Sequence, residues 1–381
     1  MDHITILVGV VIATALAFDF TNGFHDTANA MATSIATRAL RPRVAVLISG
    51  ALNIAGAFLS TEVAKTISGG IVDDGLITPG MVFAGLIGAI LWNLTTWLVG
   101  LPSSSSHALF GGLIGAVWVG AGEHGVHFAK VLEKIVIPAL ASPVVAAVAA
   151  LLATYLAYLL TAGGRDSSVN RGFRLGQIAS ASLVSLAHGT NDAQKTMGVI
   201  TLTLISVNAL PPGAGPPMWV IGASGLAIGL GTYLGGWRII RTMGKGLTDI
   251  RAPQGFAAES SAATVILTSA HLGFALSTTQ VCSGSIIGAG LGRKPAHVRW
   301  GTAARMVLAW GVTLPASASV GALAATVIVY GGTIGTVVAA LVAAAVATFI
   351  VIVSRRNPVN ARNVNDGHTV TIRPSTAKAN V

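Results

Sequence analysis

Charged residues and cysteine are both scarce in this sequence. Asp, Glu, Lys and Arg together make up 9% of its 381 residues, whereas soluble domains carry roughly 25%. The single cysteine, Cys282, excludes an internal disulfide and a metal site built from several cysteines. These absences argue against a soluble domain and against a disulfide scaffold.

Apolar residues fill the chain instead. They make up 53% of it, and the mean hydropathy is +0.74, which is typical of a protein embedded in a bilayer. We therefore predict an all-α polytopic membrane protein with about 11 membrane segments, in a range of roughly 10 to 12. The candidate segments are 4–36, 44–61, 78–100, 107–121, 136–162, 176–205, 218–237, 258–276, 277–292, 303–329 and 333–353.

Four of these segments have unusual lengths. Segments 4–36 and 176–205 are too long for one straight span, and each contains a polar motif with glycine, so we expect both to be broken inside the membrane. Segments 107–121 and 277–292 are short for a span. They are expected to be half-helices or arms of re-entrant hairpins, which are tolerated only when protein or a cavity surrounds them.

Basic residues lie in short loops, and this pattern predicts the orientation of the chain. In a soluble protein a formal charge of +10 would suggest nucleic acid as a partner. Here the basic loops indicate the cytoplasmic side, so no nucleic-acid partner is predicted. Placing these loops in the cytoplasm puts the N-terminus outside and the C-terminus inside, with lipid of the plasma or inner cell membrane around the protein. The basic loops contain Arg38, Arg41 and Arg43; Arg165, Arg171 and Arg174; Arg238, Arg241, Lys245 and Arg251; Arg293, Lys294 and Arg299; and Arg355 and Arg356.

One polar motif occurs twice. Asn-Gly-Phe-His-Asp-Thr-Ala-Asn-Ala-Met (22–31) aligns without gaps with His-Gly-Thr-Asn-Asp-Ala-Gln-Lys-Thr-Met (188–197), so that Asp26 matches Asp192 and Asn29 matches Lys195. A second pair is formed by 102–115 and 276–288, where three consecutive hydroxyl residues match. Two copies of each motif predict one site built from two halves.

The two copies are expected to run in opposite directions. An odd number of crossings separates the motif at Asp26 from the motif at Asp192, so the repeats are inverted. Inverted repeats with discontinuous helices are typical of secondary transporters, whose substrate lies near the midplane at the repeat interface. The predicted organisation is a first repeat (1–162), a basic cytoplasmic loop (163–175), a second repeat (176–330), an additional span (331–353) and a disordered cytoplasmic tail (354–381).

The carboxylates are the costly members of the paired motif. A charged group inside the membrane costs roughly 2.5–3.5 kcal/mol on insertion scales, so Asp26 and Asp192 should face protein rather than lipid. A buried salt bridge from Asp26 to Lys195 explains one such pair, although it does not explain why the surrounding residues repeat. Asp26 and Asp192 are therefore predicted to hold a coupling cation, either a proton or a metal ion.

The hydroxyl clusters predict an anion site. Ser103–Ser106 and Ser277–Thr279 each open an apolar run, and Ser and Thr favour helix N-caps. A helix N-terminus carries unpaired N–H groups and binds anions. Simple capping is the plainer interpretation of either cluster alone, whereas two clusters at matching positions favour a site for a tetrahedral oxyanion. Lys195 either contacts that anion or neutralises Asp26.

Other titratable residues lie near the paired motifs or near the predicted ends of segments. His25, His107 and His188 are candidates for a proton relay, since imidazole titrates near neutrality. Glu62 and Lys65 are expected at the membrane interface. Glu259, which opens the segment 258–276, is a minor site candidate.

The motifs resemble those of one family. Gly-Phe-His-Asp-Thr-Ala-Asn-Ala (23–30) and His-Gly-Thr-Asn-Asp-Ala-Gln-Lys-Thr-Met-Gly (188–198) resemble the duplicated signature of the inorganic phosphate transporter (PiT) family. Ser-Ser-Ser-His-Ala-Leu-Phe-Gly-Gly (104–112), Ser-Thr-Thr-Gln (277–280) and Ala-Trp-Gly-Val-Thr-Leu-Pro (309–315) are similar to its other patterns. The resemblance covers most of the chain and is closest to the bacterial low-affinity Pit-type symporters.

This resemblance implies a function and a set of site residues. It implies import of inorganic phosphate by cation symport, in a protein that is often a homodimer, with phosphate carried as a divalent metal complex in bacterial relatives. No cofactor and no resident metal site are predicted. The coupling-cation residues would be Asp26, Asn29, Asp192, Asn22 and Asn191. The phosphate-binding residues would be Ser104, Ser105, Ser106, Ser277, Thr278, Thr279, Lys195 and Gln194.

Two departures from the family pattern bear on coupling. Sodium-coupled members have Asn where this chain has Lys195, and an ammonium there would repel a second bound cation, which favours proton coupling. Gln280 stands where many members have His, so His107 has no histidine counterpart. The alternatives are a sodium-coupled phosphate symporter, a sulfate permease on the same scaffold, a passive anion channel, and an intramembrane hydrolase using Ser106 and His107.

Overall fold

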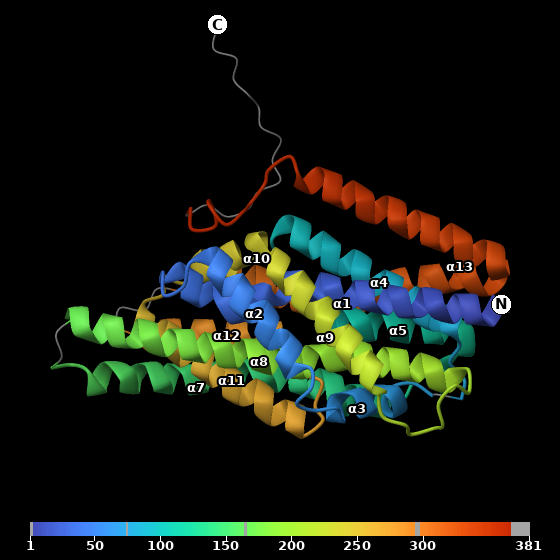
Figure 1. Cartoon of the computed structure of the whole chain (residues 1–381), viewed down its shortest axis with the longest axis horizontal. Helices are drawn as coiled ribbons and strands as arrows, with labels where there is room; N and C mark the ends of the chain where they lie inside the picture. The colour runs from blue at the N-terminus through green and yellow to red at the C-terminus, as the bar shows by residue number, and fades with distance from the viewer. Residues whose placement is uncertain (1–2, 74, 164–165, 294–297, 367–381) are drawn as a thin grey trace, which may run out of the picture.

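The computed structural model describes residues 3–73, 75–163, 166–293 and 298–366. Over these ranges the regular structure is helical, apart from two isolated β-bridges. Most helices lie along one direction, side by side, in a single bundle (Figure 1). The α-helices are α1 (His3–Ala36), α2 (Pro42–Gly56), α3 (Glu62–Gly70), α4 (Pro79–Val99), α5 (Ser105–Ala121), α6 (Phe128–Val131), α7 (Ile137–Leu160), α8 (Asp166–Ser206), α9 (Met218–Leu234), α10 (Trp237–Arg241), α11 (Ala252–His271), α12 (Thr278–Leu291) and α13 (Trp300–Ser354). The predicted all-α polytopic membrane class is therefore confirmed.

The two motif helices are continuous, and the prediction that they break inside the membrane is wrong. α1 runs unbroken through Gly23, and α8 runs unbroken through Gly189. α8 also begins at Asp166, so most of the predicted loop 163–175 is helical. Neither motif glycine has a positive φ. Both glycines have ordinary helical backbone angles that any residue could adopt. The backbone conformation therefore does not explain why glycine occupies these positions.

The reason is close packing between the two halves of the chain. A methyl group on Gly23 would overlap the carbonyl oxygen of Ile228 in α9, and one on Gly189 would overlap the carbonyl oxygen of Asn53 in α2. The matched glycines thus make matched contacts, each with a helix from the other half. Small residues at helix crossings allow backbones to approach in this way.

Replacing Gly23 with alanine is expected to lower the free energy of unfolding by about 1–3 kcal/mol, the usual cost of overpacking. The new methyl group meets backbone atoms of α9, which cannot rotate away. Gly9, on the same helix, has no atom within 4 Å of an added methyl group, so Gly9→Ala is the matched control. Thermal unfolding in detergent micelles would measure both. Equal stability of the two variants would contradict the packing argument.

Two helical hairpins carry the hydroxyl clusters. α4 turns at Gly100 into the extended residues 101–104 before α5, and α11 turns at Gly273 before α12; both glycines have a positive φ, which glycine adopts most readily. The first residues of α5 and α12 are buried, so both helices begin inside the bundle. The expectation of short arms for segments 107–121 and 277–292 agrees with these hairpins.

Glycines also join each hairpin to an outer helix. On α5, methyl groups at Gly111 and Gly115 would overlap carbonyl oxygens of α13. On α12, methyl groups at Gly284 and Gly288 would overlap carbonyl oxygens of α7. We call these two contacts the α5–α13 seam and the α12–α7 seam. In each seam the glycines are spaced four residues apart, so they lie on one helix face.

The C-terminal part of the chain reverses at Gly332. This glycine has φ 55° and ψ −134°, so α13 consists of two helical arms, which match the predicted segments 303–329 and 333–353. By length and composition alone, four helices among the described residues are long and apolar enough to cross a membrane, or five if the bent pair 218–234 and 237–246 counts as one span.

Residues after α13 were predicted as a disordered tail, but 355–366 pack against the bundle. Arg238 donates hydrogen bonds to the carbonyl oxygens of Ser354 and Asn357, each at 2.7 Å, and Val364 is buried. Backbone carbonyls at a helix C-terminus and beyond it attract such guanidinium donors. The rest of the predicted tail, 367–381, lies outside the described residues.

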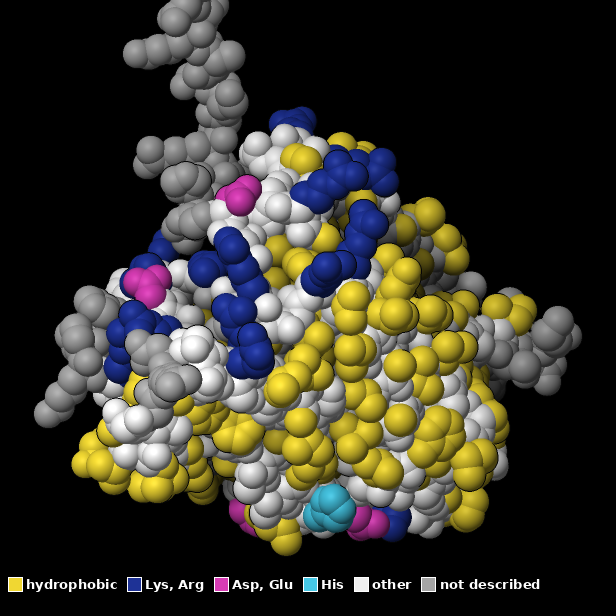
Figure 2. Space-filling view, turned by 60° about the vertical axis from the view of Figure 1, so that its left-hand side comes forward, with side chains coloured by type: hydrophobic (Ala, Val, Ile, Leu, Met, Phe, Trp, Pro, Cys, Tyr) yellow, Lys and Arg dark blue, Asp and Glu magenta, His cyan; other side chains and the backbone are white. Residues whose placement is uncertain are grey.

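The surface has a broad apolar band. Figure 2 shows this band on one face, with most of the visible Lys and Arg side chains beyond one edge and a histidine beyond the other; acidic side chains lie at both edges. Basic residues gathered at one edge of an apolar band are the pattern expected of a protein that spans a bilayer.

Candidate ion-binding site

The carboxylates of Asp26 and Asp192 lie at the centre of the bundle. α1 presents Asp26 and α8 presents Asp192, and both side chains are about 1% exposed or less. The ring of His188 lies between them, with Nε2 3.1 Å from Asp192 Oδ2 and 4.0 Å from Asp26 Oδ2. One ligand atom from each of these three residues fits within 4.8 Å of the others, a spacing suited to a cation.

The hairpins bring their hydroxyl groups to these carboxylates in matching fashion. Ser105, at the start of α5, donates to Asp26 Oδ2 at 2.6 Å. Thr278, its counterpart at the start of α12, donates to Asp192 Oδ2 at 3.0 Å. Thr279 also donates to Asp26 Oδ1 at 3.2 Å, which links the second hairpin to the first carboxylate. The predicted convergence of two motifs and two clusters in one place is present in the structure.

The first hydroxyl of each cluster has a different role. Ser104 accepts a hydrogen bond from the backbone N–H of His107 at 3.1 Å, and Ser277 accepts one from that of Gln280 at 3.3 Å. Both are helix N-caps. Capping therefore accounts for these two residues, while the next two residues of each cluster face the centre.

Lys195 pairs with Asp192, its neighbour one turn away, rather than with Asp26. Its ammonium donates to Asp192 Oδ1, to Ser106 Oγ at 2.6 Å and to the carbonyl oxygen of Leu276 at 3.1 Å. An ammonium has three protons to donate, so these three acceptors satisfy it. The residue joins α8 to both hairpins.

The predicted amides are divided between the centre and its edges. Asn29 donates to Thr279 Oγ1 at 3.1 Å and to Thr278 Oγ1 at 3.3 Å, so it lies beside both carboxylate-binding hydroxyls. Asn191 donates to the carbonyl oxygen of Leu276 at 3.2 Å. Asn22 is buried, and neither of its amide atoms has a hydrogen-bond partner within the described ranges.

Gln194, a predicted phosphate ligand, lies outside the centre and contacts α3. Its Oε1 accepts from the backbone N–H groups of Val63 at 2.8 Å and Ala64 at 3.2 Å, and its Nε2 donates to the carbonyl oxygen of Thr190. These contacts satisfy the first turn of α3. Gln194 is one residue before Lys195, so it points to another side of α8.

We expect Gln194→Ala to destabilise the fold without weakening substrate binding. Removing the acceptor leaves two N–H groups at the start of a helix without a partner, which costs about 0.5–2 kcal/mol for a lost cap. Unfolding in detergent should show this loss, and the KM for the transported anion should not change. Ser105→Ala, which alters a hydroxyl at the centre, is the contrasting variant. A raised KM in Gln194→Ala would return this residue to the binding site.

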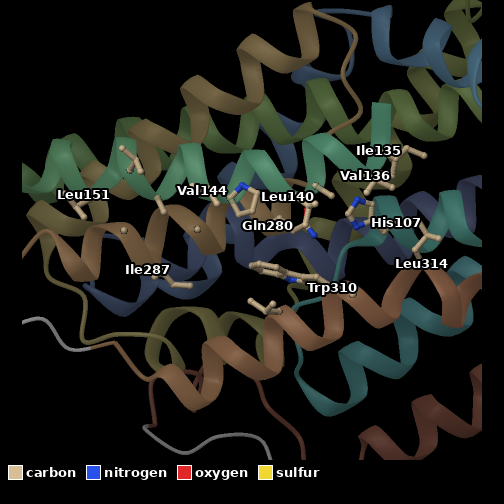
Figure 3. Close-up of a pocket in the computed structure, with 18 of the residues that line it drawn as sticks. His107, Ile135, Val136, Leu140, Val144, Leu151, Gln280, Ile287, Trp310 and Leu314 are labelled. Carbon is tan, nitrogen blue, oxygen red and sulfur yellow. The ribbon is translucent and has the colours of Figure 1, made fainter. Parts of the chain in front are cut away.

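The three histidines occupy three environments. His188 lies between the carboxylates, as described, and its Nδ1 is 3.2 Å from Asn53 Oδ1. His25 Nδ1 is 2.7 Å from Asp26 Oδ1, and its Nε2 is 3.1 Å from Thr96 Oγ1, which Ser103 in turn contacts at 2.8 Å. His107 lines a cavity on the other side of α5 (Figure 3). The first two contact a carboxylate directly, whereas His107 faces the cavity.

Two buried carboxylates lie outside this centre. Glu259 was a minor candidate; its oxygens accept hydrogen bonds from Ser34 and Ser180, each at 2.6 Å, and from Thr33, on the side of the bundle where α1 ends. Asp19 was missed. It is fully buried on α1, and its carboxylate oxygens have no hydrogen-bond partner among the described residues. Its position seven residues before Asp26 places it on the same helix face, a signal that the sequence does contain.

Glu62 and Lys65, which are expected at the membrane interface, lie on the surface of the bundle. Their side chains are each about half exposed and form an ion pair of 2.8 Å on α3. They have no part in the buried centre.

Comparisons with known proteins agree on one family. The model of the family described as "Phosphate transporter family" matches residues 22–166 and 160–321. A "Probable low-affinity inorganic phosphate transporter" from Mycobacterium bovis is 56% identical over 93% of this chain and 86% of its own length. A protein of the same description from Bacillus subtilis is 43% identical over 85% of this chain and 98% of its own length. A solved structure, "The sodium-dependent phosphate transporter", has a similar fold, with a TM-score of 0.76 and 24% identity over 84% of this chain and 98% of that one.

Proposed function

Because this chain belongs to the phosphate transporter family, we propose that it imports inorganic phosphate across the cell membrane by symport with a cation, and that the cation is a proton. It is a transporter and not an enzyme. The observation that carries the site assignment is the meeting of both motif carboxylates with the hydroxyl-rich starts of both hairpins. Asp26 and Asp192 hold the coupling cation, and the hairpin starts hold the anion.

The hydrogen bonds suggest how the two ions are coupled. Ser105 and Thr278 donate their hydroxyl hydrogen bonds to the carboxylates of Asp26 and Asp192, so these hydroxyls cannot donate to phosphate at the same time. A cation bound to these carboxylates weakens that attraction, since it neutralises the charge that the hydroxyls solvate. The hydroxyls then turn toward phosphate, together with the N–H groups of the two helix N-termini. Cation binding therefore prepares the anion site.

Lys195 favours a proton over a metal ion. Its ammonium already neutralises Asp192, so a metal ion at that carboxylate would have to displace it or bind beside a like charge. A proton needs no such space. His25 and His188, which contact the carboxylates, are suitable donors for it.

The packing supports an inverted repeat. Gly23 contacts α9 of the second half while Gly189 contacts α2 of the first, and each hairpin binds the carboxylate of its own half through the same position. Such reciprocal contacts are expected of two halves related by a pseudo-two-fold axis. With the basic loops in the cytoplasm, the proposed orientation places the N-terminus outside and the C-terminus inside.

Uptake of labelled phosphate into vesicles tests this proposal. An imposed proton gradient, acid outside, is expected to drive accumulation without sodium, and excess sulfate is expected not to compete. Uptake that requires sodium and ignores the proton gradient would overturn proton coupling. Competition by sulfate at equal concentration would overturn the substrate, and a magnesium requirement would indicate a metal–phosphate complex as the transported form.

A further inference from the structure

A long trough runs between α7, α12 and α13. Its inner part is a cavity of about 640 Å³ whose walls are apolar side chains of these helices, with Trp310 standing in one wall (Figure 3). A second cavity of about 570 Å³ continues along α7 and α12, and Leu151 and Leu291 line both. The two cavities therefore adjoin each other, and together we call them the trough.

The trough is open to the hydrocarbon core of the membrane. Leu140, Val144 and Val148 of α7 are 71%, 61% and 52% exposed along one wall, and Val307 of α13 is 56% exposed along the other. The stretch of α12 from Gln280 to Leu291 rises about 16 Å at 1.5 Å per residue. This length is close to half of a hydrocarbon core of about 30 Å, so the trough spans about one leaflet.

The end of the trough farthest from the buried carboxylates is basic. Arg293 lines it together with Tyr158, and Arg251 lies close enough to Tyr158 to interact with it electrostatically. The hydroxyl of Tyr158 is buried and has no hydrogen-bond partner within the described ranges. The guanidinium group of Arg293 and the Tyr158 hydroxyl, with a second guanidinium group nearby, are complementary to a phosphate diester.

We propose that this trough binds an anionic phospholipid from the leaflet at the basic edge of the protein. One acyl chain lies along α7 and α12 and reaches Trp310, and the headgroup phosphate binds Arg293 and Tyr158. Basic pockets between membrane helices on the cytoplasmic side are suited to such headgroups. The site is separate from the one that binds the transported ions.

A lipid in the trough would lie next to the two helix starts that form the proposed anion site. Its inner end is lined by His107 and Gln280, which directly follow Ser106 and Thr279 of the two hydroxyl clusters. The acyl chain thus contacts the first turns of both α5 and α12 from the side opposite the carboxylates. We infer that the lipid holds the two hairpin starts in place.

Fluorescence quenching tests the binding directly. The full chain is reconstituted in phosphatidylcholine vesicles containing a small fraction of either phosphatidylglycerol or phosphatidylcholine with brominated acyl chains, which quench tryptophan on contact. Brominated phosphatidylglycerol is expected to quench the wild type more than brominated phosphatidylcholine does. Trp310→Phe should remove this difference. Equal quenching by the two lipids in the wild type would overturn the proposal.

Matched variants separate the site from general attraction to an anionic membrane. Arg293→Gln and Tyr158→Phe are expected to lose the preference for phosphatidylglycerol, and Arg356→Gln, an exposed basic residue beyond α13, is expected to keep it. Gly311 lines the trough and Gly301 does not; both lie on α13 with no atom within 4 Å of an added methyl group. Gly311→Phe should therefore block quenching while Gly301→Phe should not. Loss of the preference in Arg356→Gln, or its persistence in Gly311→Phe, would overturn the proposal.

Discussion

Asp26→Asn is expected to abolish proton-driven phosphate uptake while leaving the protein folded. Asparagine has the same shape, but only its carbonyl oxygen accepts, so it keeps one of the two hydrogen bonds from Ser105 and Thr279. It can neither bind a proton nor carry a negative charge. Because the amide is always neutral, the hydroxyls no longer respond to a cation, and a proton gradient cannot drive phosphate uptake. Uptake into vesicles measures the loss, and thermal unfolding in detergent confirms that the fold remains.

Asp249→Asn is the control for this variant. Asp249 is also an aspartate with a basic neighbour, but its side chain is 67% exposed and pairs with Arg299 at 2.8 Å in a loop outside the bundle. Exposed pairs of this kind contribute about 0–1 kcal/mol. Uptake in Asp249→Asn should equal that of the wild type. Normal proton-driven uptake in Asp26→Asn would remove this carboxylate from the coupling site.

The second large effect concerns Lys195. Lys195→Met leaves Asp192 as a buried charge without its counterion, and breaking a buried pair in this way costs about 3–5 kcal/mol. The double variant Lys195→Met/Asp192→Asn removes the unpaired charge as well. It is expected to recover most of the lost stability, because both partners are then neutral, and to remain inactive in uptake because a cation ligand is missing.

The chain contains an internal control with the same spacing. Glu62 and Lys65 are also three residues apart and form an ion pair, but both side chains are about half exposed. Lys65→Met should change the unfolding free energy by less than about 1 kcal/mol. If Lys195→Met were no more destabilising than Lys65→Met, Asp192 would not depend on Lys195 for its charge balance.

The sequence predicted the membrane class and every described helix of ten or more residues, for identifiable reasons. Apolar runs of bilayer length determine helices in lipid, and α4 and α7 begin and end within a few residues of their predicted limits. The repetition of Asp26 at Asp192 indicated a shared site without any knowledge of contacts. The repeat of the motif thus predicted that two residues far apart in the sequence lie close together in space.

The sequence-based interpretation and the structure differ where one residue type serves several purposes. Gly23 and Gly189 were interpreted as helix breaks, but their lack of a side chain is used for contact with a neighbouring backbone, which depends on tertiary packing. Gln194 lies in the motif yet points to α3, because adjacent residues of a helix face different directions. Ser104 and Ser277 resemble the hydroxyls that follow them, and only the position of the first helical turn separates a cap from a ligand. Those distinctions are set by three-dimensional context.

The glycine seams determine which parts of the molecule can slide. Along the α5–α13 and α12–α7 seams, backbones touch without intervening side chains, so we expect each hairpin arm to move together with its outer helix. The contacts of these two helix pairs with the central helices α1 and α8 are of another kind. They are a few hydrogen bonds between hydroxyl groups and the side chains of Asp26, Asp192 and Lys195. Such bonds can be exchanged for bonds to ions, whereas close backbone packing cannot. The ions therefore act on the contacts that are easiest to break. We expect the alternating exposure of the site to come from two helix pairs, α5 with α13 and α12 with α7, that tilt relative to α1 and α8.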